Sequence, residues 1–490
     1  MGTDSLDPFE DTALLRYQYV ATEISKQIDS QLFIPGQKIP GTRLLAERFG
    51  VSINTVLQAQ KHLELQGLIE SVPRSGFFVR YSEQSRNKVK TPPVAKFKVR
   101  PTLVAKQRLV MDLINASLRD DLVQLGAALP GNDFLPLDDI RKAMSRAVRL
   151  KPEAMINYAF PPGNLGLRQE LSKKMKSIGC EVSHDEIVIT SGCHEAVVLA
   201  LKALTQPGDI ILLESPTFYG LLQAVESLKL KALEIPADSH NGIDIAALEA
   251  ACKRWNAKAC ILVSNFSNPL GSCASPATKA AIVNILNEND IPLIEDDIYG
   301  DLAFDGHRPP PMKSFDRDGK VIYCSSFSKT VAPGLRTGWI APGQYYEEIN
   351  YLKFTQSLGA ASMEQLALAQ YLKEGSYPRH IRRLQRLCSN QVNRTRELIL
   401  NNAPAGTLCS QPAGGFVLWI ELPKCYHTGT LYELALAEKI SIAPGSVFTG
   451  SDAYNHCFRI NCAQPWSEEY EKALLTVCGL IEKSKQPESN

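Results

Sequence analysis

Apolar residues recur at helical spacing near the start of the chain. Between residues 13 and 32 they fall on one stripe, at Tyr17, Val20, Ile24 and Ile28. This period predicts an amphipathic helix with one face turned to a core. A Pro35-Gly36 pair follows and breaks the chain. We therefore expect the first helix of a small domain to end before this pair.

Two further helical segments follow with a short turn between them. A segment over 43–49 stops at Gly50, and a second runs from the N-cap candidate Ser52 to Gln66, before Gly67. The inward side chains of the second helix are Val56, Ala59 and Leu63. The polar side chains left outward near its start are Ser52, Asn54, Thr55 and Gln58. Two helices joined by a short turn with glycine predict a helix-turn-helix, whose second helix contacts bases through its start.

Two short β-rich runs complete the first eighty residues. Residues 68–71 and 77–80 flank a PRSG turn and predict a hairpin with an arginine at its tip. The string IPGTRLLAERFGVSINTVLQAQKHLELQGLIESVPRSGFFV resembles the GntR-type winged-helix DNA-binding domain over its whole length. The resemblance implies that Arg43, after the proline turn, contacts DNA. It implies the same for Arg74 and Gly76 in the wing.

Beyond residue 110 the pattern changes to alternating strands and helices. Short β-rich runs alternate with helical stretches of ten or more residues, and these runs are 186–190, 210–213, 259–264, 292–295 and 321–324. This order predicts an α/β domain with a mostly parallel sheet covered by helices. Ligands of such folds bind at the carboxyl ends of the strands. We therefore expect the functional side chains in the segments that directly follow these runs.

Composition limits the class of protein. At 490 residues the chain exceeds one ordinary core, so we expect two or three domains. The twelve cysteines form no CxxC pair and lie in apolar stretches, which favours buried thiols in a reducing compartment over disulfides or a metal site. The acidic start is unlike a signal peptide, and no apolar run reaches membrane-spanning length. We expect a cytoplasmic protein without a membrane segment or a bound metal.

The net charge of +1 hides an uneven distribution. From residue 16 to residue 100 there are fourteen lysines and arginines against six acids, with the excess in 81–100. A basic segment beside a small helical domain is typical of a nucleic-acid binder, although a solvated linker accounts for these charges equally well. We predict a DNA-binding domain over 1–80, a basic linker over 81–110 and a large domain over 111–490.

One lysine of the large domain has a setting that favours catalysis. Lys329, in CSSFSKTVAPGLRTGW, follows an apolar strand and lies near Ser326 and Arg336. A lysine that forms a Schiff base must lose its proton, which burial and nearby positive charge favour. The string resembles the cofactor-lysine segment of fold-type I aminotransferases. By that resemblance Lys329 binds pyridoxal 5′-phosphate (PLP) as a Schiff base, while Ser326 and Arg336 hold the phosphate.

Other motifs of that family are present in the expected order. EDDIYGDL matches its Asp-x-x-Tyr, so Asp296 should pair with the pyridine nitrogen and Tyr299 with the ring hydroxyl. NFSNPLG matches its Asn-Pro-x-Gly turn, which makes Asn268 a second partner of that hydroxyl. SGCHEA offers main-chain donors to the phosphate at a helix start, from Gly192, Cys193 and His194. ESPTFYG supplies an aromatic ring to stack on the cofactor, where the register favours Phe218 and the adjacent Tyr219 stays open.

Candidates for binding an amino-acid ligand lie near both ends of the large domain. Arg459 in HCFRINCA matches the family's arginine for an α-carboxylate, a role suited to a planar bidentate donor. The alternative is a strand arginine in an ordinary salt bridge. Gly126 in VQLGAALP matches a glycine of the substrate pocket. YAFPPGNLGLR resembles the segment whose tyrosine, here Tyr158, reaches the phosphate of the neighbouring subunit, so the resemblance implies a homodimer.

Together the two halves resemble the MocR-type subgroup of GntR regulators over nearly the whole chain. The resemblance implies an N-terminal winged helix joined to an α/β fold-type I aminotransferase-like domain. It also implies that this domain senses PLP or an amino compound and alters binding to an operator in double-stranded DNA. The alternative is an active aminotransferase with an accessory DNA-binding domain. The complete DNA-binding unit favours regulation, and the sequence leaves transaminase activity open.

Overall fold

The computed structural model describes residues 16–29, 33, 38–66, 68–72, 76–79, 91–95, 97 and 99–485. The chain divides into two compact units, a small unit over residues 1–90 and a large unit over residues 91–490. Arg74, which is predicted to contact DNA, lies outside the described residues, as do residues 81–90 of the predicted linker. The domain boundaries predicted at 80 and 110 stay predictions.

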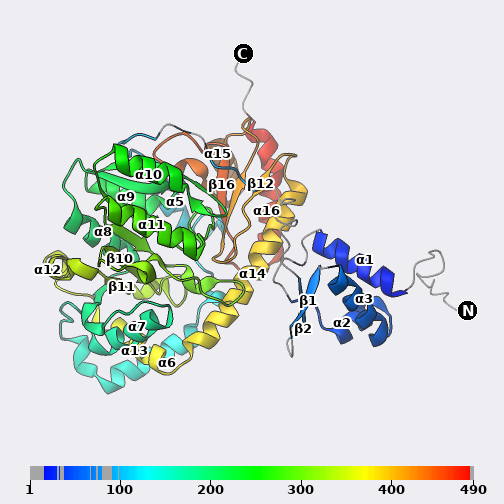
Figure 1. Cartoon of the computed structure of the whole chain (residues 1–490), viewed down its shortest axis with the longest axis horizontal. Helices are drawn as coiled ribbons and strands as arrows, with labels where there is room; N and C mark the ends of the chain where they lie inside the picture. Colours follow the sequence, from blue (N-terminus) through cyan, green and yellow to red (C-terminus); the bar gives the residue numbers. More distant parts are fainter. Residues whose placement is uncertain are drawn as a thin grey trace, which may run out of the picture. The chain divides into compact units, whose positions relative to one another are not determined.

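Three helices and a hairpin form the described part of the small unit (Figure 1). They are α1 (Arg16–Asp29), α2 (Thr42–Phe49), α3 (Ile53–Leu65), β1 (Ile69–Val72) and β2 (Gly76–Val79). Their apolar faces meet in one core, which includes Val20, Ile24, Leu45, Val56 and Leu63. The stripe predicted on the first helix and the inward face predicted on the third both belong to this core. The winged helix-turn-helix fold is therefore confirmed.

The turn between α2 and α3 has the geometry that its sequence predicts. Gly50 caps α2 in the left-handed region at φ +63°, where glycine has no Cβ to clash. The Ser52 hydroxyl accepts a hydrogen bond from the Thr55 N–H at 3.1 Å and caps α3. Gln60, buried on α3, accepts a hydrogen bond from the Thr42 hydroxyl on α2 at 3.1 Å. These contacts fix α3 against α2 and leave the first turns of α3 exposed on the opposite side.

An eight-stranded sheet forms the centre of the described part of the large unit, in the order β4-β11-β10-β9-β8-β5-β6-β7. The neighbours from β10 to β6 are parallel, whereas β11 and β7 run antiparallel to the strands beside them. The strands are β4 (Val188–Thr190), β5 (Ile210–Ser215), β6 (Lys231–Asp238), β7 (Gly242–Ile243), β8 (Ala257–Val263), β9 (Leu293–Asp296), β10 (Val321–Ser326) and β11 (Gly338–Ala341). The predicted mostly parallel sheet is therefore confirmed.

Helices cover both faces of this sheet (Figure 1). Because side chains alternate along a strand, Ile211 and Leu213 of β5 reach one face and Leu212 reaches the other. The first face packs on α8 (Cys193–Leu204), α9 (Tyr219–Ser227) and α12 (Tyr346–Ser357). The second packs on α10 (Ile245–Arg254) and α11 (Pro276–Glu288). At the β4 and β11 edge, a further layer consists of α6 (Leu137–Leu150), α7 (Leu165–Ser177) and α13 (Ser362–Lys373).

A second, four-stranded sheet lies in the C-terminal part of the large unit, in the order β12-β13-β16-β15. Its strands are β12 (Leu408–Cys409), β13 (Val417–Glu421), β15 (Ala443–Pro444) and β16 (Cys457–Asn461), and a separate parallel pair is β3 (Val123–Gln124) with β14 (Ile440–Ser441). The helices that contribute to this core are α5 (Gln107–Ser117), α15 (Thr428–Ala437) and α16 (Glu468–Ile481). Helix α14 (Tyr377–Asn402) places Leu384 in the core of the first sheet and Ile399 in that of the second. One continuous helix, seen in yellow and orange in Figure 1, thus joins the two sheets.

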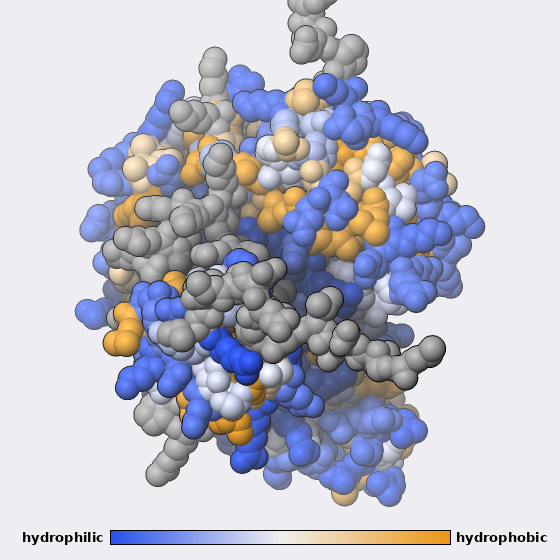
Figure 2. Space-filling model, turned by 90° about the vertical axis from the view of Figure 1, so that its right-hand side faces the viewer, coloured by the Kyte–Doolittle hydropathy of each residue, from blue (hydrophilic) through white to orange (hydrophobic). Residues whose placement is uncertain are grey.

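Hydrophilic side chains cover most of the surface in the view of Figure 2, and hydrophobic residues are exposed in patches between them. In the described part of the chain, no helix has the length and apolar character needed to cross a membrane. All twelve cysteines are free, and ten of them are buried. The expectation of buried free thiols is confirmed for these positions.

Candidate cofactor site

Lys329 lies just beyond the end of β10, at the carboxyl edge of the central sheet. Its side chain is half-buried, and Nζ donates a hydrogen bond to the Ala128 carbonyl oxygen at 2.7 Å. Burial and the nearby guanidinium of Arg459 lower the pKa of Lys329 to about 8, against the opposing charge of Asp296. At neutral pH this lysine therefore has on the order of 100 times more neutral amine than an ordinary one. A neutral amine is the form that attacks a carbonyl carbon.

Asp296 ends β9, the parallel neighbour of β10, and is opposite Cys324 in the register. Its carboxylate is buried, and Oδ1 accepts a hydrogen bond from the Cys193 thiol at 3.3 Å. Burial raises the pKa of Asp296 to about 6, although the bond from Cys193 opposes this shift. At neutral pH the site thus holds a buried anion whose donor is a weakly polar thiol. Such a group favours a ligand that carries a buried N–H.

Cys193 contributes in a way that the sequence did not indicate. We predicted only its main-chain N–H as a phosphate donor, at the start of α8. The structure places its thiol against Asp296, 103 positions away in the chain. No periodicity or motif marks this contact, because it depends on the position of α8 relative to β9.

Asn268 and Tyr299 form a hydrogen-bonded pair beside Arg459. The Asn268 amide nitrogen donates to the Tyr299 hydroxyl at 3.5 Å, and both side chains are buried. Burial raises the pKa of Tyr299, so the phenol stays protonated and remains a hydrogen-bond donor. The amide oxygen of Asn268 accepts from Arg459 Nη1 at 2.9 Å. One amide therefore connects the predicted cofactor partners to the predicted carboxylate-binding arginine.

Arg459 of β16 is fully buried and has no acidic partner among the described residues. Besides Asn268, its guanidinium donates to the Gly126 carbonyl oxygen, and it lies 5.2 Å from the Phe448 ring centroid. Its Nε has no hydrogen-bond partner in the described part of the chain. Burial lowers the pKa of Arg459, which reflects the cost of a cation without a counter-ion. In the part of the chain that it describes, the structure therefore does not show the alternative, an ordinary salt bridge of Arg459. A buried guanidinium without a carboxylate partner favours an anionic ligand.

The start of α8 and Arg336 together form an electropositive corner. Gly192 caps α8 at φ +102°, and a Cβ at this position would lie 2.7 Å from Arg336 Nη2. Arg336 donates from Nη2 to the Ser191 carbonyl oxygen at 2.8 Å. His194 lies in the first turn of α8, where partial desolvation of its ring and the charge of Arg336 lower its pKa. Main-chain N–H groups at a helix start beside a guanidinium form a site suited to a phosphate.

Three further predicted residues are Ser326 at the end of β10, Phe218 before α9 and Tyr158 on the surface. Ser326 ends β10, and its hydroxyl accepts from the Ser328 N–H at 3.3 Å. Phe218 precedes α9, and its ring centroid lies 4.6 Å from that of Tyr219, so both aromatic candidates lie close together. Tyr158 is 73% exposed and stacks on Phe160 at 5.3 Å, on the surface of the chain that contains it. Its predicted contact with a neighbouring subunit stays a prediction.

A buried network, absent from the predicted site, lies behind Asp296 and Lys329. Asp297 accepts hydrogen bonds from Arg308, from the Tyr323 hydroxyl at 3.0 Å and from the Asn265 amide at 2.9 Å. Thr330, which follows Lys329, places its carbonyl oxygen 2.6 Å from the His380 ring nitrogen of α14. These contacts fix the backbone on which the two functional side chains are placed. Sequence reasoning missed the network because its members come from distant segments.

Replacing Asp296 with asparagine should stabilise the ligand-free protein. The pKa of Asp296 is raised to about 6, so its stabilising contribution is complete below about pH 3.8 and is lost as the pH rises through 6. The variant has no charge to bury and should gain about 3 kcal/mol near pH 8, and much less near pH 4. The unfolding transition of the large unit in urea, measured at both pH values, gives the difference.

The adjacent carboxylate offers a matched control. Asp297 already has a buried guanidinium partner in Arg308, so Asp297→Asn should destabilise the same unit by about 3–5 kcal/mol. Equal changes in the free energy of unfolding for the two substitutions near pH 8 would contradict the assignment of Asp296 as a buried anion without a cationic partner among the described residues.

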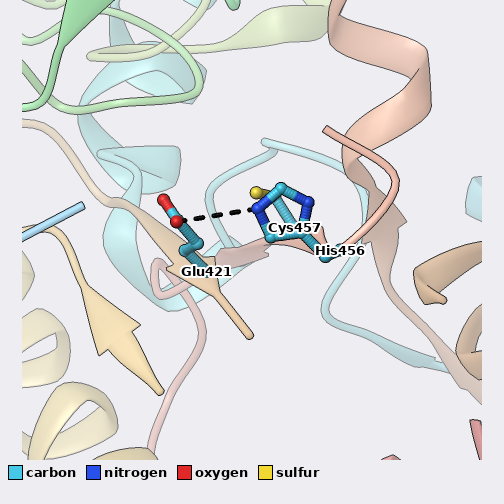
Figure 3. Close-up of side chains that lie close together, drawn as sticks. All are labelled: Glu421, His456 and Cys457. Atoms are coloured by element: carbon cyan, nitrogen blue, oxygen red, sulfur yellow. Dashed lines mark ion pairs between the residues drawn. The ribbon is translucent and has the colours of Figure 1, made fainter. Parts of the chain in front are cut away.

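Three potential metal ligands lie together on the C-terminal sheet, as Figure 3 shows. His456 Nε2 and Glu421 Oε1 form an ion pair at 3.6 Å, and Cys457 is the register partner of Glu421. Burial raises the pKa of Cys457 well above its ordinary value, so its thiol stays protonated. A metal ligand must be a thiolate. In the structure the three side chains form a histidine–glutamate pair beside a buried thiol, and the expectation of no bound metal stays a prediction.

Apart from Arg74, which lies outside the described residues, the predicted DNA-binding residues are on α2, at the start of α3 and at the start of β2. Arg43 is exposed on α2, and Asn54 and Gln58 are exposed on α3, while Thr55 is half-buried under the cap of Ser52. Gly76, at φ +106°, begins β2, where a Cβ would lie 3.1 Å from Lys38 Cε. The structure thus brings the start of α3 and Arg43 to the outside of the helix-turn-helix.

Two family descriptions match the chain. Bacterial regulatory proteins of the gntR family match residues 16–79, and aminotransferase class I and II matches residues 121–477. The uncharacterized HTH-type transcriptional regulator YjiR of Escherichia coli is 38% identical over 94% of this chain and 97% of its own length. The chain is a MocR-type member of the GntR family. The family predicted from the motifs is therefore confirmed.

This MocR-type chain also resembles solved aminotransferases. The multiple substrate aminotransferase from Thermococcus profundus aligns with a TM-score of 0.71 at 25% identity, over 76% of this chain and 94% of that one. LysN, the α-aminoadipate aminotransferase of Thermus thermophilus, aligns with a TM-score of 0.69 at 24% identity, over 76% and 94%. LysN was solved in complex with N-(5′-phosphopyridoxyl)-L-leucine. The likeness confirms the fold-type I aminotransferase-like fold.

Proposed function

We propose that this MocR-type protein is a cytoplasmic, homodimeric transcription regulator that binds operator DNA through its small unit and senses PLP or an amino compound through its large unit. The observation that supports this proposal is that one chain contains both a helix-turn-helix and a cluster of residues suited to PLP. The helix-turn-helix has its cap and an exposed recognition face, and the large unit holds an amine of lowered pKa, a buried acid and a buried arginine.

The residues of the large unit fit PLP. When bound, PLP supplies an aldehyde that reacts with amines and a ring that withdraws electrons. Lys329 would hold the aldehyde end with its amine, and Asp296 would keep a proton on the ring nitrogen. Asn268 and Tyr299 would donate to the ring hydroxyl. The start of α8 would bind the phosphate together with Ser326 and Arg336, with Phe218 or Tyr219 against the ring.

The effector class follows from Arg459. Its guanidinium already donates to Asn268 and Gly126, while Nε is unused. A carboxylate supplies the missing negative charge and accepts from a guanidinium in the bidentate geometry. A ligand that brings both an amine for the cofactor and a carboxylate for Arg459 is an amino acid. We therefore place amino acids first among the effectors.

An exposed aromatic surface supports the homodimer. Ile156, Tyr158 and Phe160 are 85%, 73% and 53% exposed, and Phe160 borders a surface hollow with Tyr351 and Phe354. Large apolar side chains gathered on a surface are typical of protein interfaces. A second copy would cover them and would bring Tyr158 to the phosphate of the neighbouring site.

Operator binding with and without PLP tests this function. The full-length protein is first used to select duplexes from a random library, and its affinity for the selected duplex is then measured at one fixed salt concentration. We expect PLP, or PLP with an amino acid, to change this affinity about 5- to 150-fold, the usual range of allosteric coupling. A protein that binds no duplex in a salt-dependent way would contradict the regulatory function.

Transamination is the second candidate. The lowered pKa of Lys329 favours it, because a lysine near neutrality accepts and returns protons at a substrate carbon. Steady conversion of an amino acid and an oxoacid at ordinary enzymatic rates, with no effect of any ligand on operator affinity, would make it the leading function.

A further inference from the structure

Two exposed aliphatic side chains stand on the recognition helix of the small unit. Ile53 and Leu57 are 48% and 44% exposed in the first two turns of α3. They are four positions apart and therefore lie on the same side of the helix. The opposite side of α3 packs into the core through Val56, Ala59 and Leu63. Within the small unit, Ile53 and Leu57 thus have no role in the core.

Their neighbours along the helix are amides. Asn54 follows Ile53 and Gln58 follows Leu57, and both amide side chains are exposed. The next exposed residue on the aliphatic side is Lys61, one turn beyond Leu57. The face therefore consists of two aliphatic–amide pairs followed by a cation, and Lys61 separates it from the exposed Leu65 one turn further on. Two aliphatic residues interrupted by a charge make a shorter apolar stripe than the three to four residues per two turns of a packed helix face.

The major groove of DNA offers one apolar group at base edges, the C5-methyl group of thymine. Asparagine and glutamine pair with the N6 and N7 atoms of adenine, the base opposite thymine. Alternating aliphatic and amide side chains at the start of a recognition helix are thus complementary to A·T pairs. Lys61 and Arg43 carry charges suited to the phosphates on either side.

We propose that Ile53 and Leu57 bind thymine methyl groups in the major groove and make the operator half-site A·T-specific at the contacted positions. The inference rests on the proposed operator binding and adds the bases that are read. Each contacted methyl group would be transferred from water into contact with an aliphatic side chain. Removing one such methyl should weaken binding about fourfold, from about 0.8 kcal/mol for a buried methyl-sized group.

Deoxyuridine in place of thymidine isolates this contact, because the two nucleosides differ only by the methyl group. The full-length protein, at constant PLP and salt, is titrated with its selected duplex and with duplexes that carry uracil at single thymine positions of each half-site. We expect about fourfold weaker binding for each contacted position. The double variant Ile53→Ala with Leu57→Ala should bind the thymine and uracil duplexes equally. Alanine favours the helix, so α3 is retained.

Leu65→Ala is the matched control. Leu65 is 80% exposed at the other end of α3, about 12 Å along the helix from Leu57. This variant should keep the full preference for thymine over uracil. Equal binding of both duplexes by the wild-type protein, with salt-dependent affinity intact, would overturn the thymine contact and leave operator binding standing. Failure to select any duplex would overturn both. A change in oligomeric state of the double variant, with unchanged methyl preference, would assign the two side chains to a second copy instead.

Discussion

Alanine in place of Lys329 should abolish covalent retention of PLP while the fold and operator binding remain. Lys329 supplies the amine of lowered pKa at the carboxyl edge of the sheet, and its hydrogen bond to the Ala128 carbonyl oxygen is its contact in the ligand-free site. Without it, PLP has the phosphate and ring contacts alone, and we expect its affinity to fall about 100-fold or more. Dialysis followed by absorption measurement of bound pyridoxal shows the loss.

A second buried lysine provides the control for this assignment. Lys279 is fully buried, its pKa is also lowered by burial, and it donates to the Asn265 amide oxygen at 2.5 Å. After borohydride reduction of the PLP-loaded protein, the pyridoxyl group should be found on Lys329 and not on Lys279. Peptide mass mapping separates the two sites. A pyridoxyl group on any lysine other than Lys329 would contradict the site.

Alanine in place of Arg459 should weaken binding of an amino-acid effector about 30-fold to several thousand-fold. The expected loss is about 2–5 kcal/mol, the range for removing one partner of a buried charge pair. PLP binding should change much less, because Arg459 acts on the cofactor residues only indirectly, through its hydrogen bond to Asn268 and through its charge near Lys329. Arg459→Lys should be intermediate, because it keeps the charge and loses the planar pair of donors. Spectral titration of the PLP-loaded proteins measures both affinities.

The ligand supplies the control for Arg459. An amine that lacks the carboxylate, and is otherwise identical to the amino acid, should bind the wild-type protein and Arg459→Ala alike. A loss of affinity that is the same for the amine and the amino acid would show a structural defect at Asn268 and Gly126, and it would contradict the role of Arg459 as the carboxylate receptor.

The sequence predicted those parts of the fold that depend on interactions between residues close together in the chain. The cap of Ser52, the stop at Gly50 and the inward side of α3 depend on residues within one or two helical turns. The central strands were also predicted, because burial on both faces produces continuous apolar runs. The predicted ends of these strands were less accurate than their positions in the chain. The run over 186–190 begins as a 3₁₀ turn capped by Ser183, and the strand starts only at Val188.

The positions of the site followed from motifs, and their interactions did not. Lys329 and Asp296 come together because β9 and β10 are parallel neighbours whose carboxyl ends share one edge. The hydrogen bond from the Cys193 thiol to Asp296 and that from the Arg459 guanidinium to Asn268 join segments 103 and 191 positions apart in the chain. Such contacts depend on the packing of α8 and of the C-terminal sheet. No local pattern in the chain records that packing.

The exposed face of α3 also contains residues that the sequence did not predict to lie there. The sequence placed the polar residues of this helix outward and assigned DNA contacts to them. The sequence pattern does not predict an outward position for Ile53 and Leu57, because an aliphatic residue in a helix is expected to be buried. The packing of α3 against α1 and α2 places these two side chains outside the core.

Reciprocal coupling between the two units tests the central claim most directly. The affinity of the full-length protein for its selected operator is measured without ligand, with PLP, and with PLP plus each amino acid of a panel. The affinity for the same ligands is then measured with and without saturating operator. The account predicts that ligand and operator change each other's affinity by one common factor, about 5- to 150-fold, and that Lys329→Ala removes the PLP response. Operator affinity that is identical under every ligand condition, in a protein that transaminates at ordinary enzymatic rates, would contradict it.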